Sequence, residues 1–356
     1  MKILIPVFGF GFSGGARVLS ELAHHWISSG NKVTFICFAD SAKPYFPTKA
    51  NIIWIDYNGT QMFSNTLKTR NYPLKYFFIR DSLKNAINNY GNDFDIVLAT
   101  HSFTALPVYL SNIKAKKFYY IQAHETEYYS VGGIKHFFYK IAAKRSYGYD
   151  LNRIVNCELY LNYKEIKANK FVYPGIDLNI FYSKKNISDE KKEKFIIGCI
   201  GRIEKTKGSK FVLDAFNILK KQNLNLELHI AFGNMKVANI EGVKIVTPKN
   251  DNELADFYRS VDVLVAPGTV QIGAIHYPVL EAFACGTSVV TTGYSKADKF
   301  NSYIVPINDV NSIVDSIKLI INDPETANIK AELAKKVVKD FTWEMVSNKM
   351  INYFSD

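Results

Sequence analysis

One stretch, residues 261–293, constrains the fold more than any other part of the chain. It reads VDVLVAPGTVQIGAIHYPVLEAFACGTSVVTTG. The apolar run at 261–266 has the length and the β-branched content of a buried parallel strand. A helix follows with Pro278 in its first turn and Gly286 at its end, the usual placement of these residues at helix ends. A second apolar strand at 288–292 completes a strand–helix–strand unit, which predicts an α/β fold with a parallel sheet.

The loop before this helix is expected to bind a ligand. In open α/β sheets, ligands bind at the carboxyl ends of the strands, and the free N–H groups of a helix start suit a phosphate. Glu281 follows one turn into the helix and has two interpretations. It is either a favourable negative charge near a helix N-terminus or a carboxylate that accepts hydrogen bonds from a ribose.

The same alternation of strand and helix recurs along the whole chain. Strands are expected at 2–7, 32–38, 95–99, 117–122, 153–157, 171–173, 195–200, 226–232, 243–246 and 303–307. Helices are expected at 16–29, 209–220, 252–259, 310–321, 327–339 and 342–354. The charged segment 184–194 has no apolar periodicity and indicates a linker, so two Rossmann-like parallel-sheet domains are predicted.

The first loop, residues 9–15, is rich in glycine and reads GFGFSGG. Its spacing does not match the dinucleotide fingerprint G-x-G-x-x-G followed by an acidic residue. Glycines such as Gly14 and Gly15 instead indicate a backbone that approaches another group closely, because glycine has no side chain in the way.

Polar residues follow two further strands of the first half. His101 follows the strand at 95–99, and His124 and Glu125 follow the strand at 117–122. Loops at strand ends are where α/β domains place their chemistry. A lone histidine in a loop is usually a surface residue, so two interpretations of His124 remain open: a surface side chain or a substrate contact.

Two cations occupy the turn GRIEKTKG at 201–208, between a strand and a helix. Arg202 and Lys207 are poor neighbours for the positive end of a helix unless an anion lies between them. A diphosphate is the natural anion. The alternative is that both are solvated surface cations.

The composition is that of a globular protein, with 47% hydrophobic and 22% charged residues. The apolar runs are shorter than the roughly 18 to 20 residues that span a bilayer. Four scattered cysteines without metal-ligand spacing predict buried thiols in a reducing cytoplasm.

The net charge of +11 fits a membrane surface, a phosphorylated substrate or a mere composition bias. No nucleic-acid module is recognisable, so nucleic acid is not expected as a partner. Segments 66–89 and 134–149 are both basic and aromatic. Each is either a helix lying on an anionic membrane or a packed helix with a solvated outer face.

Five motifs, in their order and spacing, resemble glycosyltransferase family 4, which comprises retaining enzymes of the GT-B fold. They are SGGARVLSELAHHWISSGNKVTFI, VYPGIDLNIF, GRIEKTKG, PVLEAFACGTSVVTT and FTWEMV, spread over most of the chain. The resemblance implies two Rossmann-like domains facing across a cleft. Residues 1–175 would bind the acceptor, residues 176–341 would bind a nucleotide-sugar, and the last helix, about 342–356, would pack back on the first domain.

The resemblance also implies roles for individual residues. Arg202 and Lys207 would clamp the diphosphate of the donor, Glu281 would bond its ribose, and His124 would contact its sugar. Gly14 and Gly15 would approach the donor phosphate or the acceptor. The donor site would further include Gly201, Pro278, Val279 and Leu280, and the acceptor site His101 and Glu125.

One position departs from the family pattern. The family carries two glutamates with seven residues between them, and the first helps to hold the donor sugar. Counting back from Glu281, that position is Gly273, which has no side chain. Gln271 and His276 are the nearest polar residues, and either one or the other is expected to take over the contact.

The expected function is transfer of a sugar, with retention, from a nucleoside-diphosphate-sugar to a lipid-linked or polysaccharide acceptor. Bacterial surface glycans such as capsule or O-antigen are the expected setting, in the cytoplasm or on the inner face of the membrane. No metal and no cofactor are expected, since no Asp-x-Asp occurs in a suitable loop and the nucleotide-sugar is a substrate. The alternatives are a sugar-nucleotide epimerase of the same architecture and a non-catalytic nucleotide-sugar-binding subunit.

Overall fold

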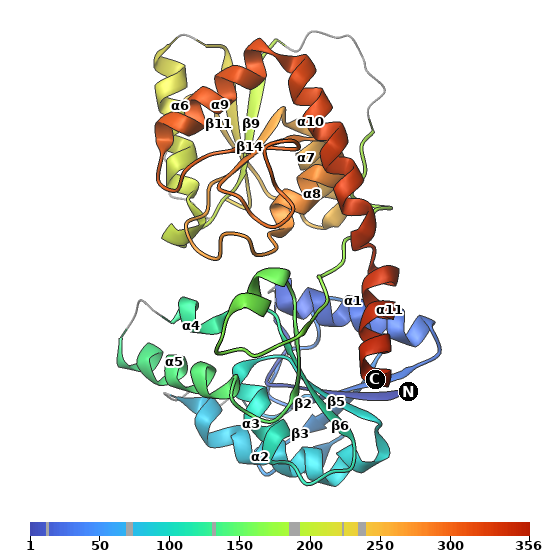
Figure 1. Cartoon of the computed structure of the whole chain (residues 1–356). Helices are drawn as coiled ribbons and strands as arrows, with labels where there is room; N and C mark the ends of the chain where they lie inside the picture. The colour runs from blue at the N-terminus through green and yellow to red at the C-terminus, as the bar shows by residue number, and fades with distance from the viewer. Residues whose placement is uncertain (12–13, 69–73, 130–132, 185–192, 223, 234–239) are drawn as a thin grey trace. The chain divides into compact units, whose positions relative to one another are not determined.

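The computed structural model describes residues 1–11, 14–68, 74–129, 133–184, 193–222, 224–233 and 240–356. The chain divides into two compact units, each with its own sheet (Figure 1). Unit 1 comprises Met1–Gly175 and Trp343–Asp356, and unit 2 comprises Ile176–Thr342.

Unit 1 is built on an eight-stranded sheet in the order β4-β3-β2-β1-β5-β6-β7-β8. Its strands are β1 (Lys2–Val7), β2 (Lys32–Phe38), β3 (Asn51–Ile55), β4 (Gln61–Met62), β5 (Ile96–Ala99), β6 (Lys116–Ile121), β7 (Asn152–Val155) and β8 (Lys170–Phe171). All neighbours pair in parallel except β3 and β4. The predicted parallel sheet thus has one additional antiparallel strand at this edge.

Helices of unit 1 pack in two groups. They are α1 (Gly14–Ser28), α2 (Lys75–Tyr90), α3 (Ser102–Leu110), α4 (Glu125–Tyr128), α5 (Ile134–Ser146) and α11 (Trp343–Ser355). The C-terminal α11 packs against α1, while α2 and α5 both pack against α3 (Figure 1). Trp26 of α1 donates its indole N–H to the backbone oxygen of Ser347 in α11 at 3.2 Å, which ties the end of the chain to its beginning.

Unit 2 is built on a six-stranded, wholly parallel sheet in the order β11-β10-β9-β12-β13-β14. The strands are β9 (Phe195–Ile200), β10 (Leu226–Ala231), β11 (Val243–Val246), β12 (Val263–Ala266), β13 (Ser288–Thr291) and β14 (Tyr303–Ile304). The helices are α6 (Ser209–Lys221), α7 (Asp251–Ser260), α8 (Tyr277–Cys285), α9 (Val310–Asn322) and α10 (Pro324–Val337). Helices α6 and α9 pack together, and α8 packs against both α7 and α10 (Figure 1).

The strand order of unit 2 reverses between β9 and β12. From β9 the chain moves to β10 on one side, and β12 then takes the other side of β9, with Ile197 opposite Val263. This is the topological switch point of an open α/β sheet, where two loops diverge and leave a crevice. The loops that follow β9 and β12 are the two sequence motifs that carry Arg202, Lys207 and His276.

Several sequence predictions need correction. The basic-aromatic helix expected from residue 66 begins only at Lys75, and residues 69–73 lie outside the described part. The charged segment 184–194 does not divide the units: Lys184, Glu193 and Lys194 belong to unit 2, and residues 185–192 are outside the described part. Strands β3 and β4 and helix α3 were not predicted. The four cysteines are buried and free, as expected.

Candidate functional site

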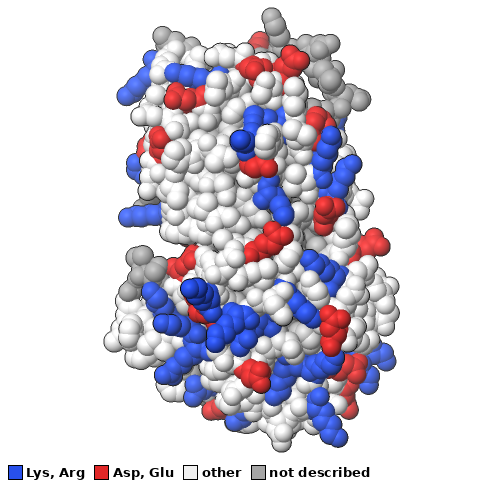
Figure 2. Space-filling model, viewed as in Figure 1, with Lys and Arg blue, Asp and Glu red and all other residues white. Residues whose placement is uncertain are grey.

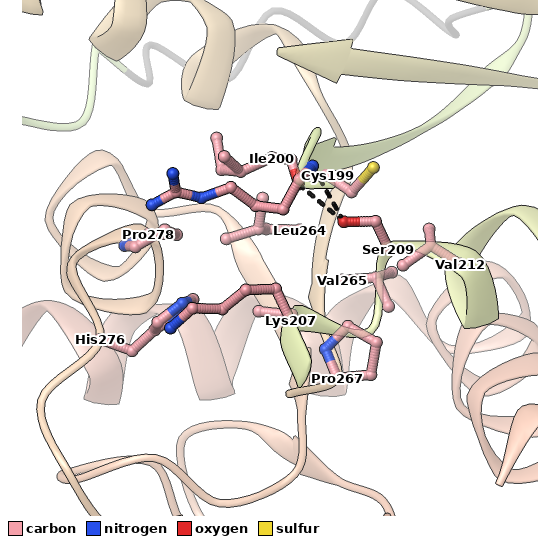
Figure 3. A pocket seen from close by; sticks show the side chains of 12 residues that line it. Cys199, Ile200, Lys207, Ser209, Val212, Leu264, Val265, Pro267, His276 and Pro278 are labelled. Atoms are coloured by element: carbon pink, nitrogen blue, oxygen red, sulfur yellow. Dashed lines mark hydrogen bonds between the residues drawn. The ribbon is translucent and has the colours of Figure 1, made fainter. Parts of the chain in front are cut away.

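A small pocket lies at the switch point of unit 2. Side chains from the loop after β9, from the end of β12 and from the start of α8 line it, including Arg202, Lys207, Ser209, His276 and Pro278 (Figure 3). Its free volume is about 20 Å³. That is room for about one water-sized group in this conformation.

The loop after β9 is held by its own backbone contacts. Ser209, the first residue of α6, accepts a hydrogen bond from the Arg202 backbone N–H at 3.2 Å and donates one to the Ile200 backbone oxygen. Gly208 caps the helix with φ of +73°, and a Cβ there would lie 2.1 Å from the Pro267 oxygen. Glycine is therefore required where this loop meets the loop after β12.

The loop after β12 is fastened to its neighbours. Thr269 donates its backbone N–H to the Thr206 oxygen at 2.9 Å, and the Thr292 hydroxyl donates to the Gly268 oxygen at 2.6 Å. A Cβ on Gly268 would lie 1.7 Å from the Tyr294 hydroxyl oxygen, so glycine alone permits Tyr294 to enter. The two loops thus form one connected support for the pocket.

Two cations face the pocket without a carboxylate partner. Within the described part of the chain, neither Arg202 nor Lys207 forms a salt bridge or a side-chain hydrogen bond. Burial, and next the charge of Arg202, lowers the pKa of Lys207, with Glu204 acting in the opposite direction. Two like charges at one pocket, without a bonded counter-ion among the described residues, make this a candidate anion site, with Arg202 exposed and Lys207 half-buried.

His276 borders the same cations. The Lys207 side chain reaches across the pocket toward its ring (Figure 3). The ring stacks on Tyr294 with a centroid distance of 4.1 Å and an angle of 10°. Its Nδ1 is buried and has no hydrogen-bond partner among the described residues. Burial lowers the pKa of His276 well below its usual value, and Lys207 and Arg202 lower it further, so the neutral form of the ring is favoured.

Glu281 does not line this pocket. It lies in the second turn of α8, is 3% exposed, and accepts a hydrogen bond from the Tyr258 hydroxyl at 2.8 Å. The interpretation as a charge in the first helical turn is therefore wrong. Its carboxylate instead joins α8 to α7.

The other residues expected at the donor site lie in α8, in the loop before it and directly after β9. Pro278 lines the pocket, whereas Val279 and Leu280 are fully buried in the helix. Gln271 has φ of +53° and accepts the Ala274 N–H through its backbone, and Gly273 donates its own N–H to Gly293. Gly201 follows β9 and donates its N–H to Ala231. The structure thus brings Arg202, Lys207, His276 and Pro278 together, but not Gln271 or Glu281.

In unit 1, His101 and Glu125 lie together. The buried Glu125 carboxylate accepts hydrogen bonds from the Ser102 backbone N–H at 2.9 Å and from its hydroxyl at 2.5 Å, and so caps α3. His101 Nε2 lies 3.4 Å from the same carboxylate, and its Nδ1 accepts the Phe103 N–H. Glu125 therefore acts first as a support for α3, while the His101 side chain is 46% exposed.

His124 is buried and has both ring nitrogens next to carboxylates. Its Nδ1 lies 2.9 Å from Glu127 and its Nε2 lies 3.1 Å from Glu165. The Thr126 hydroxyl also lies 2.8 Å from Nε2, and the ring packs edge-on to Tyr163. Both nitrogens are thus engaged within unit 1. The interpretation as a simple surface residue is wrong.

The structure describes only part of the glycine-rich loop at residues 9–15. Gly14 is the exposed first residue of α1, and residues 12 and 13 lie outside the described part. A Cβ on Gly15 would lie 3.2 Å from the Gln122 side-chain oxygen. This glycine therefore allows α1 to start close to the end of β6.

Sequence reasoning missed three residues of these sites: Ser209, Tyr294 and Glu165. Ser209 carried a usable signal, since a serine at a helix start often bonds nearby backbone groups. Tyr294 and Glu165 are distant in sequence from the histidines that they contact, and no local sequence pattern predicts these contacts. Among the described residues, no cluster of three His, Cys, Asp or Glu side chains could hold a metal ion. Nor is any described helix both long enough and apolar enough to span a membrane.

Comparison with known proteins finds a family match for the part of the chain that contains this pocket. Residues 194–323 match the family model of the glycosyl transferases group 1. D-inositol 3-phosphate glycosyltransferase of Paenarthrobacter aurescens is 27% identical over 200 residues, which are 48% of this chain and 47% of that protein. A capsular polysaccharide biosynthesis glycosyltransferase, CapM of Staphylococcus aureus, is 27% identical over 51% of this chain and 53% of its own length. The chain thus spans about half the length of these curated relatives.

Solved structures resemble the whole chain. Sucrose-phosphate synthase of Thermosynechococcus elongatus has a TM-score of 0.77 at 16% identity, over 99% of this chain and 98% of that one. Anabaena HepE, solved in complex with UDP-glucose, has a TM-score of 0.71 at 14% identity, over 100% and 99% of the two chains. WaaG, a glycosyltransferase involved in lipopolysaccharide biosynthesis, has a TM-score of 0.72 at 14% identity, covering 99% of both. The predicted fold class is confirmed: residues 194–323 match the model of the glycosyl transferases group 1, and the whole chain has the two-sheet architecture of the solved GT-B glycosyltransferases that it resembles.

Proposed function

We propose that this protein is a retaining glycosyltransferase of family 4. It transfers a sugar from a nucleoside-diphosphate-sugar to a lipid-linked or polysaccharide acceptor in bacterial surface-glycan biosynthesis. One observation carries the proposal: Arg202 and Lys207 line a pocket at the switch point without a carboxylate partner in the described part of the chain. The group 1 match covers this same region.

The chemistry of the pocket fits the leaving group of such a reaction. Negative charge grows on the nucleoside diphosphate as the glycosidic bond breaks. The two cations and the N-terminus of α8 would stabilise that charge in the way that an oxyanion hole does. Because the pocket admits only about one phosphate oxygen, most of the diphosphate would lie at its mouth.

The test compares Arg202→Ala and Lys207→Ala with Lys210→Ala. Lys210 is the matched control, since its side chain is 80% exposed and pairs with Asp214 on α6. Nucleoside-diphosphate-sugars are expected to raise the thermal midpoint of the wild type and of the control by mass action, and to raise that of the two pocket variants much less. Turnover should fall by about 10²–10³ in each pocket variant. Pocket variants with the midpoint shift and turnover of the wild type would refute the diphosphate assignment.

Retention and metal independence belong to the same proposal and rest on the resemblance to family 4. The anomeric configuration of the transferred sugar, read by NMR coupling constants, is expected to equal that of the donor. Inversion of the anomeric configuration would contradict the assignment as a retaining enzyme. The rate is expected to be unchanged by a chelator, because the two cations supply the positive charge that a divalent metal supplies elsewhere.

We further propose that unit 1 docks on an anionic membrane through α5. The outward side chains Ile134, Phe137 and Phe138 are 78%, 61% and 41% exposed, although Tyr139 and Ala143 already give the helix a buried face. Four cations flank this second apolar face, namely Lys135, Lys140, Lys144 and Arg145, and α5 contains no Asp or Glu. Such a helix fits the boundary between lipid headgroups and acyl chains.

The net charge of unit 1 also favours contact with anionic lipid. Unit 1 contains 22 Lys and Arg against 13 Asp and Glu, a net charge of +9 out of +11 for the chain. Lys and Arg side chains are spread over the visible face of unit 1, including the side that carries α5 (Figure 2). A surface of this kind is attracted to anionic headgroups, and salt screens the attraction.

Sedimentation with vesicles tests the docking surface. The wild type is expected to pellet with vesicles of mixed phosphatidylglycerol and phosphatidylcholine at low salt, and less at high salt. Replacing Lys140, Lys144 and Arg145 by Glu should abolish pelleting, whereas the same change at the exposed Lys210, Lys249 and Lys336 of unit 2 should not. Equal loss in both triple variants would show a response to net charge alone and overturn the α5 assignment.

A further inference from the structure

The His276 ring is held in one place by residues that nothing in the sequence pattern links to it. His276 is the residue before α8, and its ring lies flat on Tyr294, which follows β13. Tyr294 reaches this position only because Gly268 has no side chain. A histidine fixed in this way between two loops is built into the pocket wall rather than loosely exposed.

The ring has unused hydrogen-bonding capacity that points to an absent ligand. Its Nδ1 is buried and has no partner within the described residues. Buried polar atoms are nearly always paired, so an exception calls for a partner in another state of the protein. The charged groups nearest to the ring, Lys207 and Arg202, are themselves donors only, and a group that satisfies all three must be an acceptor.

We propose that His276 is a third phosphate-binding residue, which donates its Nδ1–H to the phosphate oxygen that Arg202 and Lys207 also hold. This inference rests on the proposed function and deepens it. It differs from the role expected from the sequence, in which His276 replaced a glutamate that holds the donor sugar. The geometry points to the phosphate, because the ring borders the two cations in a pocket with room for about one oxygen.

Proton uptake follows from this arrangement. In the empty pocket, burial, Lys207 and Arg202 hold the pKa of His276 well below its usual value. Lys207 and Arg202 face the ring from the loop after β9, and Tyr294 faces it from the segment after β13. An anion bound among these groups adds the opposite charge and raises the pKa of His276. Anion affinity must therefore increase as pH falls through the pKa of the bound state.

Sulfate is the probe, because it carries a constant charge between pH 5 and 9. Its dissociation constant is measured at pH 5.5 and pH 8.0 in wild type, H276N, H276Q and the control H24Q, which changes a histidine of α1 in unit 1. Asn places an amide N–H close to the position of Nδ1 but does not titrate. Thermal unfolding of each variant without sulfate reports whether it folds.

Wild type and H24Q are expected to bind sulfate at least fivefold more tightly at pH 5.5 than at pH 8.0. H276N should bind sulfate like wild type at pH 8.0 but should not bind it more tightly at pH 5.5. H276Q should bind sulfate more weakly than wild type at both pH values. A purely structural role for His276 would change affinity without removing the pH dependence.

Two results would overturn the inference, and they are distinguishable. If H276N keeps the full pH dependence, His276 is not a phosphate ligand, and the assignment of Arg202 and Lys207 stands. If wild type and K207A bind sulfate equally weakly, the pocket is not an anion site, and the proposed function fails together with the inference.

Discussion

At the scale of single residues, the pocket depends on contacts that only glycine permits. Gly208 lets the loop after β9 approach Pro267, and Gly268 lets Tyr294 come under His276. The charged side chains are thus fixed by positions that carry no charge. The sequence predicted that Arg202 and Lys207 lie close together, because they share one short turn, whereas the stacking of His276 on Tyr294 was not predictable.

Gly268→Ala tests this support. The added methyl would meet the Tyr294 hydroxyl, so Tyr294 must move, at a cost of about 1–3 kcal/mol in the free energy of unfolding. The variant should also lose sulfate affinity, because the His276 ring loses its platform. Gly133→Ala is the control, since a Cβ there meets no described atom within 4 Å. Equal stability and affinity in both variants would show that the platform is unimportant.

At the scale of elements, the predicted bounds of a strand or helix match the structure best where the apolar pattern in the sequence is strongest. The strands Lys32–Phe38, Phe195–Ile200 and Val243–Val246 begin and end where the sequence predicts, because they are β-branched runs between polar residues. Helix α3 was missed because it is apolar on all sides and contains Pro107. Its only signal was the capping box from His101 to Thr104.

In the candidate sites, too, the neighbours of a side chain were predictable only where the order of the strands determines them. Loops after adjacent parallel strands must lie together, so the meeting of Arg202, Lys207 and His276 was foreseeable in outline. The burial of Glu281 against Tyr258 depends on how α8 is rotated against α7, which no local pattern specifies. The same applies to Glu165, whose contact with His124 joins separate segments of unit 1.

One charge cluster links three strands of unit 2 and predicts an acid-sensitive stability. Glu227 of β10 pairs with Lys194 before β9, with Lys244 of β11 and with His229. Hydrogen bonds from these partners lower the pKa of Glu227 from 4.5 to about 2. A depressed carboxyl pKa contributes stability above the unfolded pKa, and this contribution is lost as pH falls from about 4.5 toward 2.

The thermal midpoint of Glu227→Gln is therefore expected to fall less steeply than that of wild type between pH 5 and pH 3. The exposed Asp315→Asn is the control and should follow wild type. A wild-type slope in Glu227→Gln would mean that the cluster does not contribute to acid sensitivity. Screening by added salt should reduce the difference.

At the scale of the whole molecule, the chain returns to unit 1 after completing unit 2. Helix α11 places Phe354 against Trp26 at 5.7 Å and Phe118 at 4.8 Å between ring centroids. Unit 1 thus contains both ends of the chain. The core of unit 1 therefore includes side chains of α11.

Phe354→Ala should destabilise unit 1 by about 3–5 kcal/mol, because the side chain is 1% exposed and its removal leaves a cavity. The exposed Asn348→Ala on the same helix is the control and should change stability by less than about 0.5 kcal/mol. Denaturant unfolding measures both. A near-neutral Phe354→Ala would mean that α11 does not contribute to the core of unit 1.

The central claim is that the pocket at the β9–β12 switch point holds the diphosphate of a nucleotide-sugar. A crystal structure with the nucleotide-sugar that most raises the thermal midpoint tests it most directly. The predicted result is a phosphate oxygen within hydrogen-bond distance of Arg202, Lys207 and His276. A nucleotide bound elsewhere, with these three side chains unchanged and out of its reach, would contradict the account.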